Sequence, residues 1–249
     1  MRRREFTTLL AMGLVAGGLL VNAIAPAWAL DVSPMVAKLT PTGPGSSYRM
    51  TVRNTSATAA TVEMEVYRMQ VDDAGARTVT PEDNDIVAFP VQSVIPANRE
   101  QIVQVRYVGD PTEEGRMYLV RAAQLPITMQ TTTAEGGAGA DVQVAFTINT
   151  YVFVAPARAK ASVEVLGVAR SPAGDILIST RNPGTGFAHL RETRITLTTA
   201  DGKTHEVPAA DVDVGDVSVI PGGGSRQIRV PAALASNIAG DVTASIVLL

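Results

Sequence analysis

The chain has 249 residues, of which 18% are charged and 46% apolar, and its formal net charge is −3. This length suits one large domain or two of moderate size, and the mild charge excludes a disordered tail and a basic nucleic-acid surface. With no cysteine and only two histidines, His189 and His205, the chain offers no disulfide, no cysteine nucleophile and too few ligands for a histidine-built zinc or copper centre.

Residues 1–29 have the pattern of a secretory signal peptide. Three N-terminal arginines precede an apolar run that ends at Ile24, and Ala27-Trp28-Ala29 has the small residues of a cleavage site. Glycines and Pro26 interrupt the run, which favours cleavage after Ala29 over a retained membrane anchor. We therefore expect an exported chain without stable membrane insertion. The arginines do not distinguish general secretory export from twin-arginine export.

The first half of the mature chain predicts an all-β domain. Short runs of alternating apolar and polar residues are separated by Gly, Pro, Asp and Asn, which is typical of a sandwich or barrel. Val62, Met64 and Val66, for example, alternate with polar neighbours, so one face of that strand belongs to a core. The strands predicted here lie near 32–39, 48–54, 61–71, 85–89, 100–108, 116–124 and 141–155.

The segment from Asp141 to Val154 is long for a single strand. It has fourteen alternating residues after a glycine-rich loop, whereas strands commonly have about five or six. The part from Tyr151 onward would suffice for the domain's own core, so the earlier part is surplus apolar strand. Two interpretations stay open: a long central strand with neighbours on both sides, or an edge strand that pairs with another chain.

The second half repeats the pattern after Pro156, which removes a ladder donor and predicts a linker. We predict an N-terminal domain over 30–157 and a C-terminal domain over 158–249. Each is large enough for an immunoglobulin-like sandwich of ~100 residues. The strands predicted in this half lie near 161–170, 175–181, 189–199, 203–207, 216–220, 226–230 and 241–248.

No arrangement of catalytic residues emerges from the sequence. Neither histidine accompanies a G-x-S-x-G elbow, and no S-x-x-K occurs, so both histidines are predicted to be surface strand or turn residues. The aspartate clusters at 83–85 and 211–216 lack the spacing of a calcium loop. The sequence therefore predicts no enzyme, no metal site and no cofactor.

Seven short motifs occur in an order and spacing that match one known family. They are Tyr48–Asn54, Phe89-Pro90-Val91, Val94-Ile95-Pro96, Gln124-Leu125-Pro126, Val142–Phe146, Asn182-Pro183-Gly184 and Ile220-Pro221-Gly222. Together they resemble the periplasmic pilus-assembly chaperones of the chaperone-usher pathway, which include those of P pili and type 1 pili. The resemblance covers nearly the whole mature chain and implies an all-β fold of two immunoglobulin-like sandwiches at an angle.

The resemblance implies a periplasmic, non-enzymatic chaperone that binds, folds and caps pilus subunits and delivers them to an outer-membrane usher. In this family the chaperone completes the subunit by donor-strand complementation. The donor residues would be Val142, Val144, Phe146 and Ile148. Because such an edge is adhesive when empty, we also expect the protein without its subunit to form self-capping dimers or to have a disordered 130–141 loop.

Two positions depart from the family pattern. The family holds the C-terminal carboxylate of the subunit with an Arg on the first strand and a Lys on the donor strand, and these positions align with Lys38 and Tyr151. Lys38 keeps the charge without the bidentate fork of Arg, whereas Tyr151 is neutral near pH 7. Arg121 and Arg158 are candidate replacements. The Arg of the family's interdomain salt bridge aligns with Ala155.

An alternative of a different class stays open. A secreted structural or adhesive β-sandwich protein would have the same composition. Such a protein would assemble with copies of itself and would have no need of a surplus donor strand.

Overall fold

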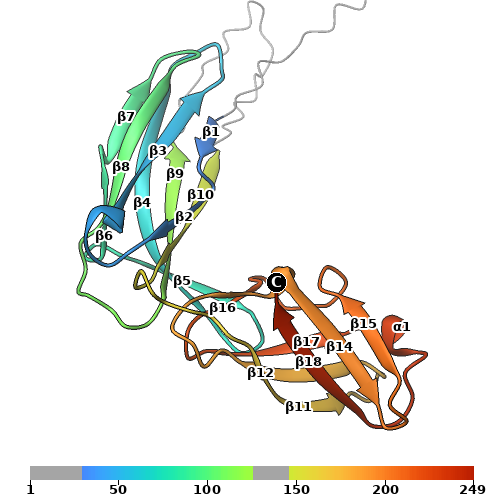
Figure 1. Ribbon diagram of the computed structural model, residues 1–249. Coiled ribbons are helices and arrows are strands. Elements are labelled where there is room, and N and C mark those ends of the chain that lie inside the picture. The colour runs from blue at the N-terminus through green and yellow to red at the C-terminus, as the bar shows by residue number, and fades with distance from the viewer. Residues whose placement is uncertain (1–29, 126–145) are drawn as a thin grey trace, which may run out of the picture.

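The computed structural model describes residues 30–125 and 146–249, which form two β-sandwiches set at an angle (Figure 1). The first sandwich contains β1 to β10 and the second contains β11 to β18. The fold class predicted from the sequence is confirmed. Among the described residues, no helix is both long and apolar enough to cross a membrane.

The first sandwich consists of two mainly antiparallel sheets. One sheet has the order β1 (Leu30–Ser33), β3 (Ser47–Asn54), β8 (Glu100–Tyr107) and β6 (Ile86–Phe89). The other has the order β2 (Val36–Leu39), β10 (Thr147–Val154), β9 (Arg116–Gln124), β4 (Ala60–Val71) and β5 (Arg77–Pro81), and β7 (Gln92–Ile95) also pairs with β4. A short 3₁₀ turn, η1 (Pro44–Ser46), precedes β3.

The single strand predicted at 32–39 is wrong, because the chain changes sheets within it. β1 pairs antiparallel with β3, whereas β2 pairs parallel with β10 in the opposite sheet. Pro34 lies between the two strands and has no N–H to donate, so a continuous ladder is interrupted there. The consequence is that β10 has β2 beside its second half only.

The second sandwich is built from shorter strands. One sheet contains β11 (Glu164–Arg170), β12 (Ile176–Arg181) and β17 (Ser225–Val230), and another contains β15 (Thr204–Pro208), β14 (Thr193–Thr199) and β18 (Val242–Leu248). A third pair, β13 (Ala188–His189) with β16 (Val219–Ile220), lies at the domain junction, and α1 (Ala232–Ala235) precedes β18. The strand predicted at 189–199 is interrupted by a 3₁₀ turn, η2 (Leu190–Glu192).

Each sandwich contains a fully buried asparagine that ties a strand end to a loop. The Asn54 side-chain amide donates to the Ile95 carbonyl at 3.0 Å, and that of Asn182 donates to the Ile220 carbonyl at 3.0 Å. A buried side-chain amide that forms its hydrogen bonds costs the fold little free energy, whereas a buried amide without partners would strongly destabilise it. Asn54 and Asn182 therefore have a structural role in the two sequence motifs that contain them, Tyr48–Asn54 and Asn182-Pro183-Gly184.

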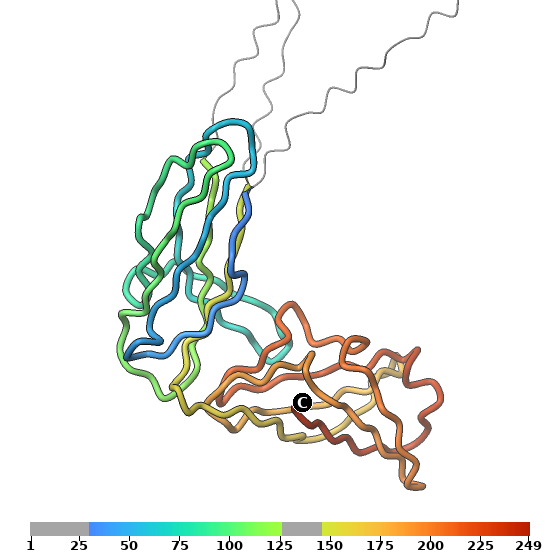
Figure 2. The backbone as a smooth tube through the Cα atoms, turned by 45° about the horizontal axis from the view of Figure 1, so that its top comes forward, coloured from blue at the N-terminus to red at the C-terminus, as the bar shows by residue number. Residues whose placement is uncertain are grey.

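The turn between β4 and β5 joins the two sandwiches through backbone contacts (Figure 2). The Gln227 N–H donates to the Asp73 carbonyl at 2.8 Å, and the Asp216 N–H donates to the Gly75 carbonyl at 3.0 Å. Gly75 has φ of 84°, and a Cβ built there would lie 2.2 Å from the Val214 carbonyl oxygen. The turn and the second sandwich thus meet at a distance that only glycine permits.

Beneath this turn lies Arg226, whose exposed fraction is 1%. Its guanidinium donates to the carbonyls of Val214, Val217 and Val219. Burial lowers the pKa of Arg226, and the nearby carboxylates of Asp72 and Asp73 on the β4–β5 turn act in the opposite direction. The first sandwich therefore supplies negative charge to a cation buried in the second. This pairing of charge across the junction involves Asp72, Asp73 and Arg226, whereas residue 155 is an uncharged alanine.

The close approach at Gly75 predicts a large effect of a single methyl group. Gly202 is a matched control, because it also has a positive φ of 83°, but a Cβ added there would have no atom within 4 Å. We expect Gly202→Ala to lower the free energy of unfolding by about 1–2 kcal/mol from backbone strain alone. Gly75→Ala should cost more and should widen the angle between the domains, as measured by urea unfolding and small-angle X-ray scattering. Equal costs and identical scattering would contradict the proposed contact.

Candidate functional site

The first half of β10 has an edge with which no described strand pairs. β10 pairs along its whole length with β9, but only Tyr151–Val154 pair with β2. The Tyr151 N–H donates to the Met35 carbonyl at 2.9 Å. Because backbone groups of alternate residues point to the same side of an antiparallel strand, Thr147 and Asn149 direct their N–H groups toward this open edge. The strand therefore has two neighbours in its second half and one, among the described residues, in its first half.

The structure describes two of the four predicted donor residues. Val142 and Val144 lie outside the described residues. Phe146 is half-buried just before β10, and Ile148 is half-buried against the core of its own sandwich, on the same face as the buried Val152. Ile148 thus marks the point at which the apolar face of the segment enters the domain's own core.

The opposite face of β10 forms the floor of the junction between the sandwiches. Phe153, with an exposed fraction of 6%, packs with residues from both domains. Its ring centroid lies 5.0 Å from that of Phe187 and 5.9 Å from the imidazole of His189. His189, predicted to be a surface strand or turn residue, lies in β13 and is half-buried against an aromatic ring of the other sandwich.

Lys38 and Tyr151, the two predicted carboxylate anchors, lie on one face of the sheet. In the parallel β2–β10 pair, Lys38 is opposite Phe153 and Val36 is opposite Tyr151. Paired residues share a face, so Lys38, Phe153 and Tyr151 all point toward the junction. Lys38 is exposed and Tyr151 is half-buried. The structure brings the two positions to neighbouring strands, two residues apart.

The arginine that contacts Tyr151 is Arg77, and it is neither of the two candidates indicated by the sequence, Arg121 and Arg158. Arg77 on β5 donates to the Tyr151 hydroxyl at 3.1 Å. Arg121 reaches the same face but is engaged by Glu65 at 3.3 Å and by Asn149 at 3.1 Å. Arg158 is exposed on the linker. The sequence analysis did not identify Arg77 because it lies 74 residues from Tyr151, and no local sequence pattern predicts a contact at that separation.

A cavity of about 330 Å³ opens where β2, the linker and the second sandwich meet. Lys38, Phe153 and His189 contribute side chains to its wall, together with small residues of the linker. Within the two described ranges, no group of three or more His, Cys, Asp or Glu side chains is placed to hold a metal ion. The chemistry of this cavity is that of a positively charged, partly apolar pocket.

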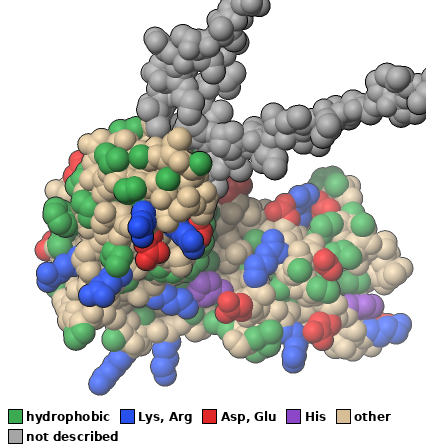
Figure 3. Space-filling view, turned by 90° about the horizontal axis from the view of Figure 1, so that it is seen from above, with side chains coloured by type: hydrophobic (Ala, Val, Ile, Leu, Met, Phe, Trp, Pro, Cys, Tyr) green, Lys and Arg blue, Asp and Glu red, His purple; other side chains and the backbone are tan. Residues whose placement is uncertain are grey.

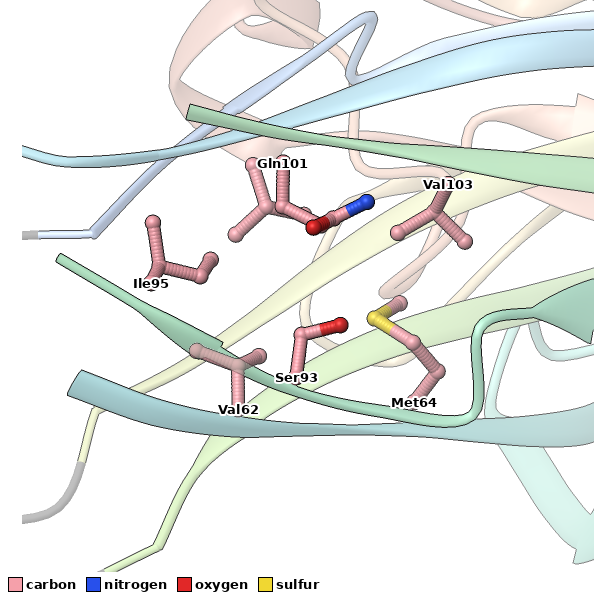
Figure 4. Close-up of a pocket in the computed structure, with 7 residues that line it drawn as sticks. Val62, Met64, Ser93, Ile95, Gln101 and Val103 are labelled. Atoms are coloured by element: carbon pink, nitrogen blue, oxygen red, sulfur yellow. The ribbon is translucent and has the colours of Figure 1, made fainter. Parts of the chain in front are cut away.

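A second group of side chains, between β4, β7 and β8, is a packed interior. Figure 4 shows Val62, Ile95 and Val103 pointing toward one another with Met64, Ser93 and Gln101 beside them. The space between them does not admit a water-sized molecule. This region is therefore part of the core of the first sandwich and not a ligand site.

Exposed apolar side chains gather on the first sandwich where the chain passes from β6 to β7. Phe89 is 71% exposed, Val91 is 56% exposed and Val94 is 66% exposed. β7 pairs with β4, and β9 separates β4 from β10, so this apolar patch is distinct from the open edge of β10. Viewed from above, apolar and charged side chains are mixed over the surface of both sandwiches (Figure 3).

No family model and no curated protein matches the sequence. Solved structures do match the fold. The class 5 fimbrial chaperone CfaA is 14% identical with a TM-score of 0.56, over 88% of this chain and 98% of that chain. The E. coli chaperone DraB is 17% identical with a TM-score of 0.51, over 86% and 89% of the two chains.

A third match comes from a complex of the Salmonella enterica SafA pilin with the SafB chaperone. It is 14% identical with a TM-score of 0.53, over 83% of this chain and 86% of that chain. At these identities the comparisons show a shared two-domain fold. The resemblance to pilus-assembly chaperones that the sequence motifs indicated is confirmed at that level.

Proposed function

We propose that the chain is a periplasmic chaperone of pilus subunits, exported with cleavage after Ala29 and organised as domains 30–157 and 158–249. The observation that carries the proposal is the open edge of β10 beside a cleft that presents Lys38. A strand edge with unsatisfied backbone groups is a template for a strand from another chain. The shared fold with fimbrial chaperones supports the same conclusion.

Strand donation uses both the backbone and the side chains of the segment before Tyr151. Thr147 and Asn149 offer backbone groups at the edge, and a subunit strand would satisfy them. Val142, Val144, Phe146 and Ile148 recur every second residue, about 6.6–6.8 Å apart along an extended strand, and would fill the groove of an incomplete subunit. Each of these side chains that moves from water into the groove offers roughly 1.5–3 kcal/mol before the costs of association, and Phe146 and Ile148, which are already half-buried, offer less.

The carboxylate at the C-terminus of the subunit would bind at the cleft face. Lys38 supplies a positive charge there, and Tyr151 supplies a hydroxyl that already accepts from Arg77. In this arrangement Arg77 provides the second positive charge that Tyr151 lacks. A charge-assisted hydrogen bond contributes about 1.5–3 kcal/mol, which is less than the apolar contribution of the donor segment.

An outer-membrane usher would bind the chaperone while the subunit is held. The apolar patch formed by Phe89, Val91 and Val94 suits this role, since it stays exposed when the β10 edge is occupied. Contiguous exposed apolar residues commonly mark a surface that binds another protein.

The donor segment predicts the outcome of a co-purification experiment. With a candidate subunit co-expressed in the periplasm, the wild type should give a soluble one-to-one complex, and Val142→Asp with Val144→Asp should abolish it, because charges cannot enter an apolar groove. The same double variant should disperse self-capped dimers of the free protein in sedimentation. Phe89→Asp with Val94→Asp, which also adds two carboxylates, is the matched control and should retain the subunit.

Retention of the subunit by the Val142/Val144 variant would contradict strand donation. Homopolymers of the wild type in place of the one-to-one complex would favour the structural or adhesive sandwich. Both variants are first compared with wild type by urea unfolding, which separates loss of binding from loss of the fold.

Removal of the charge at Lys38 should weaken capture without abolishing it. From the loss of one charge-assisted contact, we expect Lys38→Met to raise the dissociation constant of the subunit roughly 10- to 150-fold. Lys38→Arg should restore binding, and Lys160→Met, at an exposed lysine of the linker, is the charge-matched control. A Lys38→Met variant that binds like the control would exclude Lys38 as the anchor.

The Phe89/Val94 double variant separates the two partners. It should hold the subunit as tightly as the wild type but lose binding of the complex to the purified periplasmic domain of the usher, measured by surface plasmon resonance. The Val142/Val144 variant has the opposite expected defect. Unchanged usher binding by the Phe89/Val94 variant would place the usher surface elsewhere.

A further inference from the structure

The cavity between the two sandwiches combines basic groups from both. Lys38 comes from β2 of the first sandwich and His189 from β13 of the second, and both line the same space of about 330 Å³. None of the described residues that line the cavity is acidic. Ala155, Ala157, Ala159 and Gly186 border it with small side chains or none, so the space between the two basic groups stays open.

His189 is held firmly in this wall. It pairs with Val219 across the β13–β16 ladder, and its ring meets Phe153 at an interplanar angle of 68°. The charged groups that act on it are Lys38, from β2, and Glu192, from the turn that follows β13, whereas Phe153 and Val219 carry no charge. Burial lowers the pKa of His189, repulsion by Lys38 lowers it further, and Glu192 opposes both.

We propose that His189 is a proton-binding residue of an anion pocket that it shares with Lys38, and that the pocket takes a terminal carboxylate of a bound polypeptide. This inference rests on the proposed function. A carboxylate placed at Lys38 cancels the repulsion that disfavours the imidazolium and adds an attraction to it. Capture of the carboxylate is therefore coupled to uptake of a proton by His189.

The sign of the coupling follows from linkage. Affinity rises as the pH falls through the pKa of His189 in the complex, and it becomes constant below the pKa of His189 in the free protein. Stability of the free protein changes in the opposite direction, because a lowered histidine pKa in the folded state makes acid destabilising. Tighter binding in acid is thus not a consequence of a more stable fold.

The chain's two histidines make the electrostatic part directly measurable. The imidazole C2–H resonances of the folded protein are titrated by NMR, and His189→Gln assigns them. We expect His189 to titrate below the ordinary value, and Lys38→Met to raise the pKa of His189. A His189 pKa that Lys38→Met does not move would overturn the shared pocket, whatever the function of the protein.

The ligand class is tested with a synthetic Val-Thr-Val-Thr-Phe peptide bearing a free C-terminal carboxylate. Its C-terminal amide, sodium acetate and inorganic phosphate are the comparisons. The carboxylate peptide should raise the pKa of His189 and bind more tightly in acid, up to about tenfold for each unit of that rise, and the amide should do neither. Phosphate as effective as the peptide would assign the pocket to a small anion, and no response to any probe would overturn the proposal.

The variant His189→Gln should flatten the pH dependence while retaining the binding that Lys38 supplies at pH 8. The second variant, His189→Phe, keeps an aromatic ring against Phe153 but cannot bind a proton, so it separates loss of the proton from loss of packing. If a pilus subunit binds but wild type and both variants share one pH slope, the proton coupling is wrong and the chaperone function stands. If no subunit binds the wild type, the proposed function itself fails.

Discussion

The cleft depends on how closely two backbones approach at the domain junction. The β4–β5 turn touches the second sandwich through carbonyl and amide groups, with Gly75 against Val214 and a buried Arg226 beneath it. Such a contact has little freedom to adjust, since a backbone cannot change rotamer as a side chain does. It fixes the angle between the sandwiches, and with it the position of His189 relative to β2 and β10.

The change of sheet at Pro34 produces two features of the site at once. Because β1 pairs with β3, the first half of β10 has no described neighbour on that side. Because β2 pairs with the second half of β10, Lys38 reaches the cleft face beside Phe153. A single uninterrupted first strand would pair with one sheet only. It would then either cover the β10 edge or remove Lys38 from the cleft.

Local patterns predicted the sandwiches well and the junction poorly. Alternation in β4 places Val62 and Met64 in the core as expected, and the motif asparagines Asn54 and Asn182 prove to be buried ties between strands and loops. The contact of Arg77 with Tyr151, by contrast, joins distant parts of the chain. Such contacts depend on how the sheets curve and how the domains dock, which period-two alternation does not encode.

In strand donation, apolar burial supplies most of the affinity, whereas the charged contact selects the register. A slip of one residue would turn every apolar side chain of the donor segment to the wrong face, so alternation alone excludes it. A slip of two residues keeps all faces correct, because Val142, Val144, Phe146 and Ile148 form a repeat that nearly superimposes on itself. Such a slip moves the subunit by about 6.6–6.8 Å, which takes its terminal carboxylate out of hydrogen-bonding range of a fixed cation. A modest contact at Lys38 can therefore select the register even though the apolar side chains supply most of the affinity.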